Sequence, residues 1–442
     1  MSHKYVIIDP FSVEQVRSSF CYLPYLVYAA LKTENQDVVI IEDFTEKDIA
    51  NLPEADHYIV GLWSYPQIEM CLKINTLLKE KVLFAGYSPL ILSLNLKELE
   101  SLDKYIETGL QYVVLYYQDF KNLLLSDSDM HTNKYGGLVY PLFTSYGCTN
   151  KCKFCPVAAN CKGERQAIPL NMVFSILDYC EEKGYKNIHF MDEDFFYDID
   201  RSAVILEYTK GKGFQYISLG TAGRVLEFVK AYGAQYLKDR DMKVIEIGLE
   251  SADQDLNKQM GKVARGGRNR YETLAEMAKG YFDIFWLTMT FFPGETISSL
   301  RQTGKFLEKY GYKYGEMYKR IQTNSSVGGL GQFFQFYEGT EGDKFRDEGM
   351  ILAHSPHRLE PSFVPDSFLD SLVTKSRPIT EAEKAWYRLY DLPEAMIETK
   401  FKIENLESIF LLAVDLKKKF LDLKAKDIFT FLAISARLGV IE

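Results

Sequence analysis

The sequence lacks long apolar runs and any excess of positive charge. No stretch of about 18 apolar residues occurs among its 442 residues, so we expect no transmembrane helix. The first residues enter a strand-like segment without the apolar region of a secretory signal, so we expect a cytoplasmic protein. The net charge is −9, and the basic triplet Lys417–Lys419 is typical of a solvated helix face. These features argue against nucleic-acid binding.

Cysteine is scarce and unevenly placed. The seven cysteines are odd in number and clustered, which excludes a regular secreted disulfide framework and fits a reducing compartment. Residues 346–442 contain no cysteine, so we expect no auxiliary iron–sulfur cluster there. Hydrophobic residues make up 47% of the chain and charged residues 26%, as in globular proteins with sizeable cores.

Three of the cysteines share one short loop. Cys148, Cys152 and Cys155 follow an apolar segment in Cys-x3-Cys-x2-Cys spacing. Thiolates are soft ligands that suit iron–sulfur clusters, zinc or Cu(I). If the loop holds a cluster of four irons, three thiolates leave one iron open for a substrate or cofactor.

Two other interpretations of this loop remain open. Cys161 would complete a four-thiolate zinc site, although it lies six residues past Cys155, no histidine is near, and zinc motifs usually pair their cysteines more regularly. The three cysteines would otherwise be small core residues, but their Lys, Thr and Asn neighbours are a poor core pattern. The spacing also leaves open whether Cys161 is inert, a ligand or a hydrogen donor.

The cysteine spacing, with the aromatic Phe154 before the last cysteine, resembles the signature of radical S-adenosylmethionine (SAM) enzymes. The resemblance implies a [4Fe-4S] cluster on Cys148, Cys152 and Cys155 whose open iron binds SAM. It also implies reductive cleavage of SAM to a 5′-deoxyadenosyl radical that activates a substrate C–H bond. An electron donor of the flavodoxin or ferredoxin type is then required.

Residues 1–125 have the pattern of a doubly wound α/β domain. Four short apolar runs alternate with helical patterns over Tyr22–Lys32 and Glu69–Lys79. Such runs are typical of buried parallel strands in βαβ order. The predicted strands are Tyr5–Ile8, Val38–Ile41, Tyr58–Gly61 and Val82–Ala85.

This region resembles the cobalamin-binding domain of one radical SAM subgroup. The resemblance implies cobalamin contacts near the C-terminal ends of the strands, where such sheets bind ligands. Tyr87 stands in a turn that usually has small residues, and no Asp-x-His-x-x-Gly motif is present. The alternative is a Rossmann-like scaffold without cobalamin. The candidate cobalamin residues are Gly61, Ser64, Gly86, Tyr87 and Ser88.

Residues 138–345 predict a partial (β/α)6 barrel, preceded by a polar linker at Ser126–Gly137. The helix expected over Leu170–Lys183 has one apolar stripe that includes Cys180, which we predict to be core. Repeated right-handed βα units curl into a barrel, whose active site gathers at the C-terminal strand ends. The predicted strands are Tyr140–Ser145, Asn187–Met191, Tyr216–Gly220, Lys243–Gly248, Phe285–Phe291 and Phe333–Tyr337.

Polar residues follow several of these strands. A carboxylate after the second strand would suit the SAM ammonium group, although Asp192 and Asp194 would equally cap the next helix. Arg224 would meet the SAM carboxylate or lie exposed. The segments Ile247–Ser251 and Phe292–Thr296 resemble further motifs of the family, with Phe291 or Phe292 at a usual glycine. The candidate SAM residues are Phe154, Asp192, Glu193, Asp194, Arg224, Glu250 and Ser251.

Residues 346–442 predict a mainly helical C-terminal domain, with apolar stripes over Glu381–Tyr390 and Leu406–Phe420. The favoured hypothesis is a radical SAM enzyme that performs cobalamin-dependent C-methylation of a small molecule, lipid or peptide. One alternative is a radical SAM rearrangement, cyclisation or epimerisation without cobalamin. Another is a non-catalytic metal-cluster sensor or scaffold. No catalytic residue is assigned beyond the cluster ligands.

Overall fold

The computed structural model describes the chain in several stretches. These are residues 3–10, 23–62, parts of 70–78, 82–86, 139–311 without 156, 159–160, 162, 183 and 263–268, then 332–334, 340–345, 349–351, 363–371, 377–388, 392 and 425–441. The linker expected at Ser126–Gly137 and the helix expected at Leu406–Phe420 lie outside the described residues. No helix within the described stretches is long and apolar enough to cross a bilayer.

The N-terminal region contains a four-stranded parallel sheet in the order β2-β1-β3-β4. The four predicted apolar runs all lie in these strands, and one predicted helix is α1. The elements are β1 (Lys4–Pro10), α1 (Leu23–Thr33), β2 (Asp37–Phe44), the 3-10 helix η1 (Glu46–Asn51), β3 (His57–Leu62) and β4 (Val82–Gly86). Because β1 is central, it is buried on both faces, which explains its unbroken apolar sequence.

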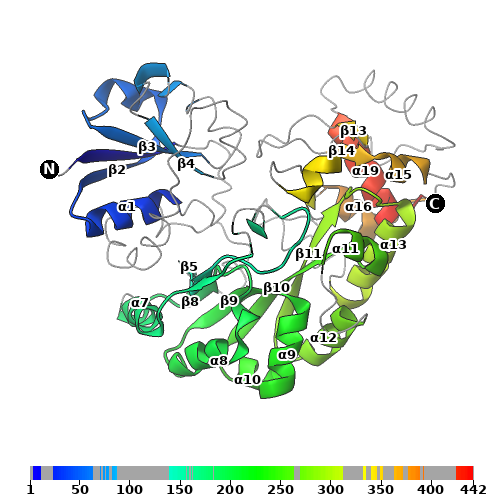
Figure 1. The fold of residues 1–442 in the computed structure, drawn as a ribbon. Coiled ribbons are helices and arrows are strands. Elements are labelled where there is room, and N and C mark those ends of the chain that lie inside the picture. The colour runs from blue at the N-terminus through cyan, green and yellow to red at the C-terminus, as the bar shows by residue number, and fades with distance from the viewer. Residues whose placement is uncertain are drawn as a thin grey trace.

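The central region is a six-stranded parallel sheet in the order β12-β11-β10-β9-β8-β5, with its helices on the outer face (Figure 1). Strand order follows chain order, which is the arrangement of a partial (β/α)6 barrel. Its elements are β5 (Val139–Leu142), α7 (Leu170–Glu182), β8 (Asn187–Phe190), the 3-10 helix η4 (Phe195–Tyr197), α8 (Ile199–Tyr208), β9 (Gln215–Gly220), α9 (Ala222–Tyr232), α10 (Ala234–Lys238), β10 (Met242–Glu250), α11 (Gln254–Gln259), α12 (Arg270–Ala278), β11 (Asp283–Thr290), α13 (Ile297–Tyr310) and β12 (Gln332–Phe333).

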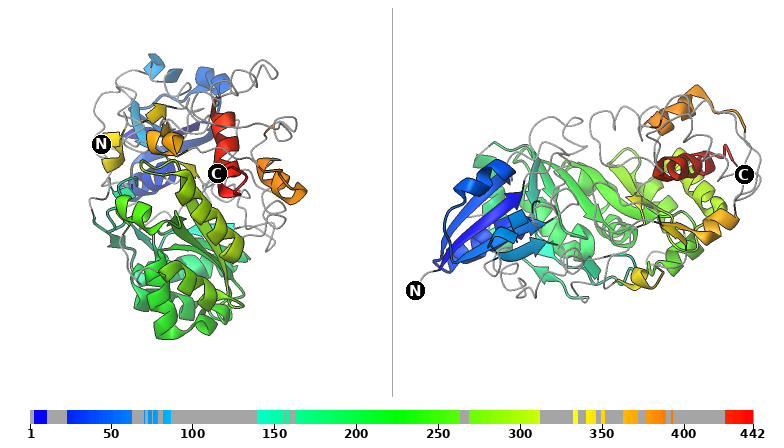
Figure 2. Two further views of the ribbon diagram at one scale, coloured as in Figure 1. Left: turned by 90° about the vertical axis from the view of Figure 1, so that its right-hand side faces the viewer. Right: turned by 90° about the horizontal axis from the view of Figure 1, so that it is seen from above.

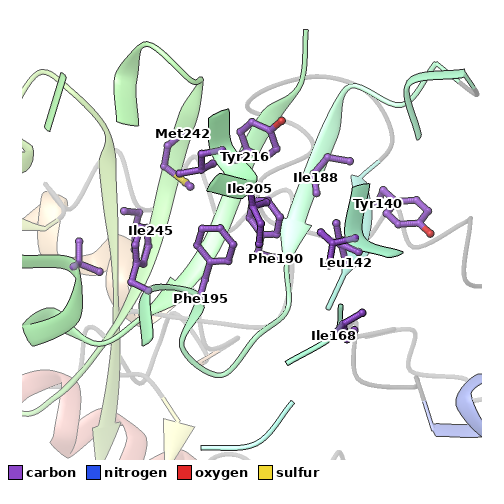
Figure 3. Close-up of a cluster of buried hydrophobic side chains, with 14 of the residues drawn as sticks. Tyr140, Leu142, Ile168, Ile188, Phe190, Phe195, Ile205, Tyr216, Met242 and Ile245 are labelled. Atoms are coloured by element: carbon purple, nitrogen blue, oxygen red, sulfur yellow. The ribbon is translucent and has the colours of Figure 1, made fainter. Parts of the chain in front are cut away.

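Aliphatic and aromatic side chains together form the core between this sheet and its helices (Figure 3). Phe190 of β8 stacks on Phe195 with ring centroids 4.1 Å apart and on Tyr216 of β9 at 5.3 Å. The predicted core residue Cys180 is fully buried in the same cluster. Buried residues of α1 belong to this cluster too, so the cores of the N-terminal sheet and the barrel are contiguous.

The first barrel strand ends earlier than the expected Tyr140–Ser145. The backbone N–H of Thr144 donates to the Asp192 carboxylate and so leaves the strand ladder after Leu142. The chain then forms β6 (Ser145–Tyr146), which pairs antiparallel with β7 (Gln166–Ala167). The result is a separate two-stranded ribbon at the base of the cysteine loop.

Two other barrel strands differ from their predicted ends. β10 runs past Gly248 to Glu250 through a register shift against β11. β11 stops at Thr290 because Phe291 adopts a left-handed backbone with φ +69°. Both irregularities lie at the C-terminal strand ends, where the sequence predicts the site.

The C-terminal region is mainly helical in its described parts but also contains a short hairpin. The 3-10 helix η5 (Glu341–Phe345) precedes it, and its elements are β13 (Gly349–Ile351), β14 (Phe363–Pro365), α15 (Asp366–Asp370), α16 (Glu381–Arg388) and α19 (Ala425–Arg437). β13 and β14 pair antiparallel. This region lies beyond the end of β11, and the N-terminal sheet lies at the opposite end of the molecule (Figures 1 and 2).

Candidate active site

The cysteine loop lies at the C-terminal edge of the barrel sheet, between the β6–β7 ribbon and the loop after β10. The thiols of Cys148, Cys152 and Cys155 are half-buried and unpaired by disulfides. Burial raises the pKa of the Cys155 thiol to about 12, and the neighbouring Cys152 and Cys148 add to that rise. Burial likewise raises the pKa of Cys148 and of Cys152. The three sulfurs therefore share one environment that disfavours free thiolates.

Backbone N–H groups are nevertheless directed at two of these sulfurs. Val157 and Ala158 donate to the Cys155 sulfur, and Asn150 donates to the Cys148 sulfur, which in each case opposes the rise in pKa. Such donors are typical of cysteines that ligate iron–sulfur clusters, because they stabilise charge on the ligating sulfur. A bound metal would reverse the protonation preference outright. The loop therefore fits a metal cluster better than it fits free thiols.

Asp192 fixes the start of this loop. It is fully buried and accepts hydrogen bonds from the backbone N–H of Thr144 at 2.9 Å and from its hydroxyl at 2.8 Å. The Ser145 hydroxyl also donates to it. Asp192 caps no helix in the described part of the chain, and its carboxylate oxygens accept hydrogen bonds from the start of the loop. Asp198, a residue that the sequence analysis did not single out, caps α8 instead.

Glu193 is one of the predicted carboxylates close to the cysteines, and its charge acts on Cys148 and Cys161. The backbone N–H of Gly147 donates to its Oε2 at 3.1 Å. Burial raises the pKa of Glu193 to about 7. Gly147 itself has φ +90°, and a Cβ there would lie 2.5 Å from the carbonyl oxygen of Glu164, so the site requires glycine. Glu193 is therefore a buried carboxyl tied to the first residues of the cysteine loop.

Cys161 packs against the back of the same loop. Its sulfur accepts hydrogen bonds from the Tyr146 hydroxyl and from the backbone N–H of Cys148, while burial raises the pKa of its thiol. A Cβ on Gly147 would lie 3.4 Å from that sulfur. In this position Cys161 supports the backbone of Cys148.

Asp194 joins the second and third strand ends. Its carboxylate accepts from the Thr221 hydroxyl at 2.8 Å and from the Thr221 N–H at 3.3 Å. Burial raises the pKa of Asp194 to about 6, against the opposing effects of Thr221 and Arg224. Asp194 therefore holds the start of α9, the helix that carries Arg224.

Two arginines flank one aromatic ring next to these carboxylates. The guanidinium carbon of Arg224 lies 4.9 Å from the Tyr197 ring centroid, and that of Arg165 lies 4.7 Å from it. Arg224 also pairs with Glu227 at 2.8 Å, and Arg165 donates to the Ser145 hydroxyl at 2.7 Å. Sequence reasoning named Arg224 but missed Arg165, which belongs to no motif and is brought here by the β6–β7 ribbon.

Glu250 lies at the end of β10 in a left-handed conformation with φ +54°. It forms an ion pair with Lys262, whose Nζ lies 2.9 Å from Oε1, and both side chains are 14% exposed. Lys262 is close enough to Cys152 to oppose the rise in the pKa of that thiol. Lys262 was not predicted, because nothing in the sequence around it indicates a buried partner.

Ser251 does not join this group. It is fully buried, and its hydroxyl lies 3.2 Å from that of Thr303 on α13 and accepts from the Asp253 N–H at 3.1 Å. The left-handed backbone of Glu250 ends β10, and Ser251 follows it in a turn whose N–H donates to the Leu249 carbonyl. Its place is at the start of α11.

Phe154 connects the cysteine loop to the loop after β11. It packs against Phe292 with ring centroids 6.5 Å apart, and Phe292 packs against Phe334 at 5.1 Å. The backbone of the loop is held nearby, since the Lys153 N–H donates to the Met260 carbonyl at 2.9 Å. The two predicted loops thus share one apolar wall.

The cobalamin candidates are only partly described. Gly61 lies in β3 opposite Ala85 of β4, and Gly86 ends β4 opposite Leu62. Ser64, Tyr87 and Ser88 lie outside the described residues.

The positions of the described side chains do not favour a site for a single metal ion such as zinc. Within the stretches that the structure describes, no three Cys, His, Asp or Glu side chains could hold one metal ion together. Four thiolates on zinc would stand about 4 Å apart, given Zn–S bonds of about 2.3 Å. A cubane cluster spreads its ligands over separate irons, so it does not need that convergence.

Comparison with known proteins agrees with this geometry. Residues 142–307 match the family model of the Radical SAM superfamily. No curated protein matches the chain in sequence.

Solved structures share the fold over the whole chain. TsrM from Kitasatospora setae, a radical SAM methyltransferase solved with cobalamin and a [4Fe-4S] cluster, is 11% identical with a TM-score of 0.57, covering 99% of this chain and 100% of that one. OxsB, a cobalamin-dependent SAM radical enzyme solved with aqua-cobalamin and SAM, is 13% identical with a TM-score of 0.55, covering 99% of this chain and 72% of that one. Residues 142–307 are thus similar to the Radical SAM superfamily, and the fold of the chain is similar to that of TsrM and OxsB.

Proposed function

We propose that this chain is a cobalamin-dependent radical SAM methyltransferase that acts on an unactivated carbon. The observation that carries the proposal is the parallel β2-β1-β3-β4 sheet that precedes a barrel with the three-cysteine loop. The fold similarity to TsrM and OxsB, both solved with cobalamin, supports the same domain order. The proposed domains are 1–125 for cobalamin, 138–345 for the cluster and SAM, and 346–442 as a C-terminal helical domain.

The residues of the site divide into three proposed roles. Cys148, Cys152 and Cys155 would hold a [4Fe-4S] cluster, which supplies one electron to cleave SAM while cobalamin supplies the methyl group. Glu193 would receive the SAM ammonium group, because its carboxylate accepts the Gly147 N–H at the start of the cysteine loop. Arg224 would orient the SAM carboxylate.

The surrounding residues keep this arrangement rigid and dry. Asp192 holds the loop start, and the Phe154–Phe292 wall excludes water next to Cys155. The reaction requires an electron donor, which we propose is of the flavodoxin or ferredoxin type. We also propose that the enzyme works in the reducing cytoplasm, where exposed thiols survive.

Metal analysis after anaerobic purification with cobalamin in the medium tests the proposal. About four irons and one cobalt per chain, with 5′-deoxyadenosine or S-adenosylhomocysteine formed from SAM under a strong reductant, is the expected result. Iron without cobalt would overturn the cobalamin assignment and favour a rearrangement, cyclisation or epimerisation. Zinc in place of iron would overturn the enzymatic assignment altogether.

A further inference from the structure

Glu295 is a buried carboxyl in the turn after β11, away from the cysteines. It is fully buried, and its Oε2 accepts the backbone N–H of Phe291. Within the described residues, its Oε1 has no hydrogen-bond partner. Burial raises the pKa of Glu295 to about 8, and the charge of Arg437 opposes that rise. A carboxyl in such a place costs free energy, so its retention calls for a local explanation.

The backbone of Phe291 supplies that explanation. Its φ of +69° lies in the left-handed region, where the side chain of a bulky residue is strained. This conformation ends β11 and turns the Phe291 N–H toward the Glu295 side chain. The hydrogen bond therefore offsets the strain of a conformation that glycine would adopt without strain.

Residues of the C-terminal region contact this turn on one side. Phe368 of α15 packs edge-on against Phe291 with ring centroids 5.0 Å apart. The Ser367 hydroxyl donates to the Glu295 carbonyl at 2.8 Å. Arg437, at the end of α19, donates to the Thr290 hydroxyl at 2.9 Å.

The other side of the turn faces the cysteine loop. Phe292, the residue after the strained position, is almost fully buried among Leu256, Met260 and Phe334. Its ring meets Phe154, which directly precedes Cys155. A shift of the turn would therefore move one wall of the cluster loop.

We propose that Glu295 is a positioning residue that holds the strained turn at Phe291 and thereby sets the Phe154–Phe292 wall against which SAM binds. The proposal rests on the radical SAM assignment of the cysteine loop. Under this proposal the C-terminal region contributes to SAM binding. Residues of α15 and α19 contact the turn whose backbone conformation Glu295 stabilises.

Paired variants test the hydrogen bond itself. Glu295→Ala removes the acceptor for the Phe291 N–H and should weaken SAM binding to the reconstituted protein about tenfold. Glu295→Gln keeps an acceptor oxygen and should stay within about twofold of the wild type. Equilibrium dialysis with labelled SAM gives the dissociation constants. Hydrogen exchange of residues 291–296 in the cluster-free protein gives a second readout and should be faster only in Glu295→Ala.

A second pair isolates the backbone strain. Phe291→Gly and Phe291→Ala both remove the ring that packs on Phe368, but only glycine removes the left-handed penalty. The tenfold effect of Glu295→Ala should shrink in the glycine background and persist in the alanine background. Tyr387→Phe, which removes the buried hydrogen bond to Ser435, is the control for general loosening of the C-terminal region.

The outcomes distinguish a failure of the positioning role of Glu295 from a failure of the proposed radical SAM function. Equal SAM affinity in Glu295→Ala, Glu295→Gln and wild type would overturn the positioning role. The positioning role would also be overturned if Tyr387→Phe weakened SAM binding as much as Glu295→Ala does. Failure of the wild type itself to bind iron or SAM would instead count against the radical SAM function.

Discussion

Lys262 and Glu250 form a largely buried ion pair directly beside Cys152. The lysine Nζ lies 2.9 Å from Oε1 of the glutamate and also donates to the Gly248 carbonyl. Burial alone would lower the pKa of Lys262, but Glu250, Tyr271 and Cys152 together outweigh burial and raise it, so the ammonium stays charged. The pair therefore fixes a positive charge and the strained end of β10 at the edge of the cysteine loop.

Lys262→Met should destabilise the protein by about 3 kcal/mol, because it leaves the Glu250 carboxylate buried without its partner. Urea unfolding of the cluster-free protein measures the change. Lys212→Met is the matched control, since Lys212 pairs with the more exposed Asp178 and Glu181 and should lose less than about 1 kcal/mol. Equal losses in the two variants would contradict the special role of the buried pair.

The sequence predicted the architecture well because alternating apolar runs and amphipathic segments are local signals. The β11 strand and the burial of Cys180 follow from such periodicity. It predicted the strand ends less well. Strand β5 ends near the point where Asp192, a carboxylate distant in sequence, accepts the backbone N–H of Thr144. A local pattern contains no information about that partner.

The same distinction between local sequence signals and long-range contacts applies to the residues of the site. The cluster cysteines and Glu193 lie in motifs or directly after strands, so their place at the sheet edge was predictable. Arg165 and Lys262 reach the site from loops without a pattern, and Arg437 reaches β11 from the far end of the chain. Such contacts depend on how separate helices and loops pack together. The spacing of residue types along the sequence does not predict that packing.

Cys148→Ala should lose most of its iron, because two thiolates remain for a cluster that the loop would hold with three. The expected result is a fall from about four irons per chain to less than one, with loss of SAM cleavage. Iron and sulfide analysis with an optical spectrum measures it. Cys180→Ala is the control, since Cys180 is buried in the core and its loss should reduce stability but spare iron. Full iron in Cys148→Ala would refute the ligand assignment.

Glu295 should make stability depend on pH. Its pKa is about 8 in the folded protein against an ordinary value of 4.5, so the folded state binds a proton that the unfolded state releases. Its contribution is fully present below pH 4.5 and is lost as the pH rises toward 8. Glu295→Gln cannot titrate, so its stability relative to wild type should rise by about 1 kcal/mol per pH unit between pH 5 and 7.

Urea unfolding of both proteins across that range tests this expectation. If their stabilities run parallel with pH, Glu295 has an ordinary pKa and the burial argument fails. Asp178→Asn is the control, because the exposed Asp178 has a lowered pKa from its Lys212 and Tyr208 partners and its effect is confined to more acidic solutions.

The C-terminal helix α19 approaches the barrel closely at Gly304 of α13. A Cβ at this position would lie 2.1 Å from the backbone carbonyl oxygen of Arg437, and backbone cannot rotate away as a side chain can. Gly304→Ala improves helix propensity by about 1 kcal/mol, but overpacking against α19 costs about 1–3 kcal/mol or more, and this contact is severe. We therefore expect a net loss of about 2 kcal/mol in urea unfolding. Lys305→Ala, at the next and exposed position of the same helix, should be close to neutral. A stabilised Gly304→Ala protein would mean that propensity outweighs the contact and that α19 does not pack on α13 in this way.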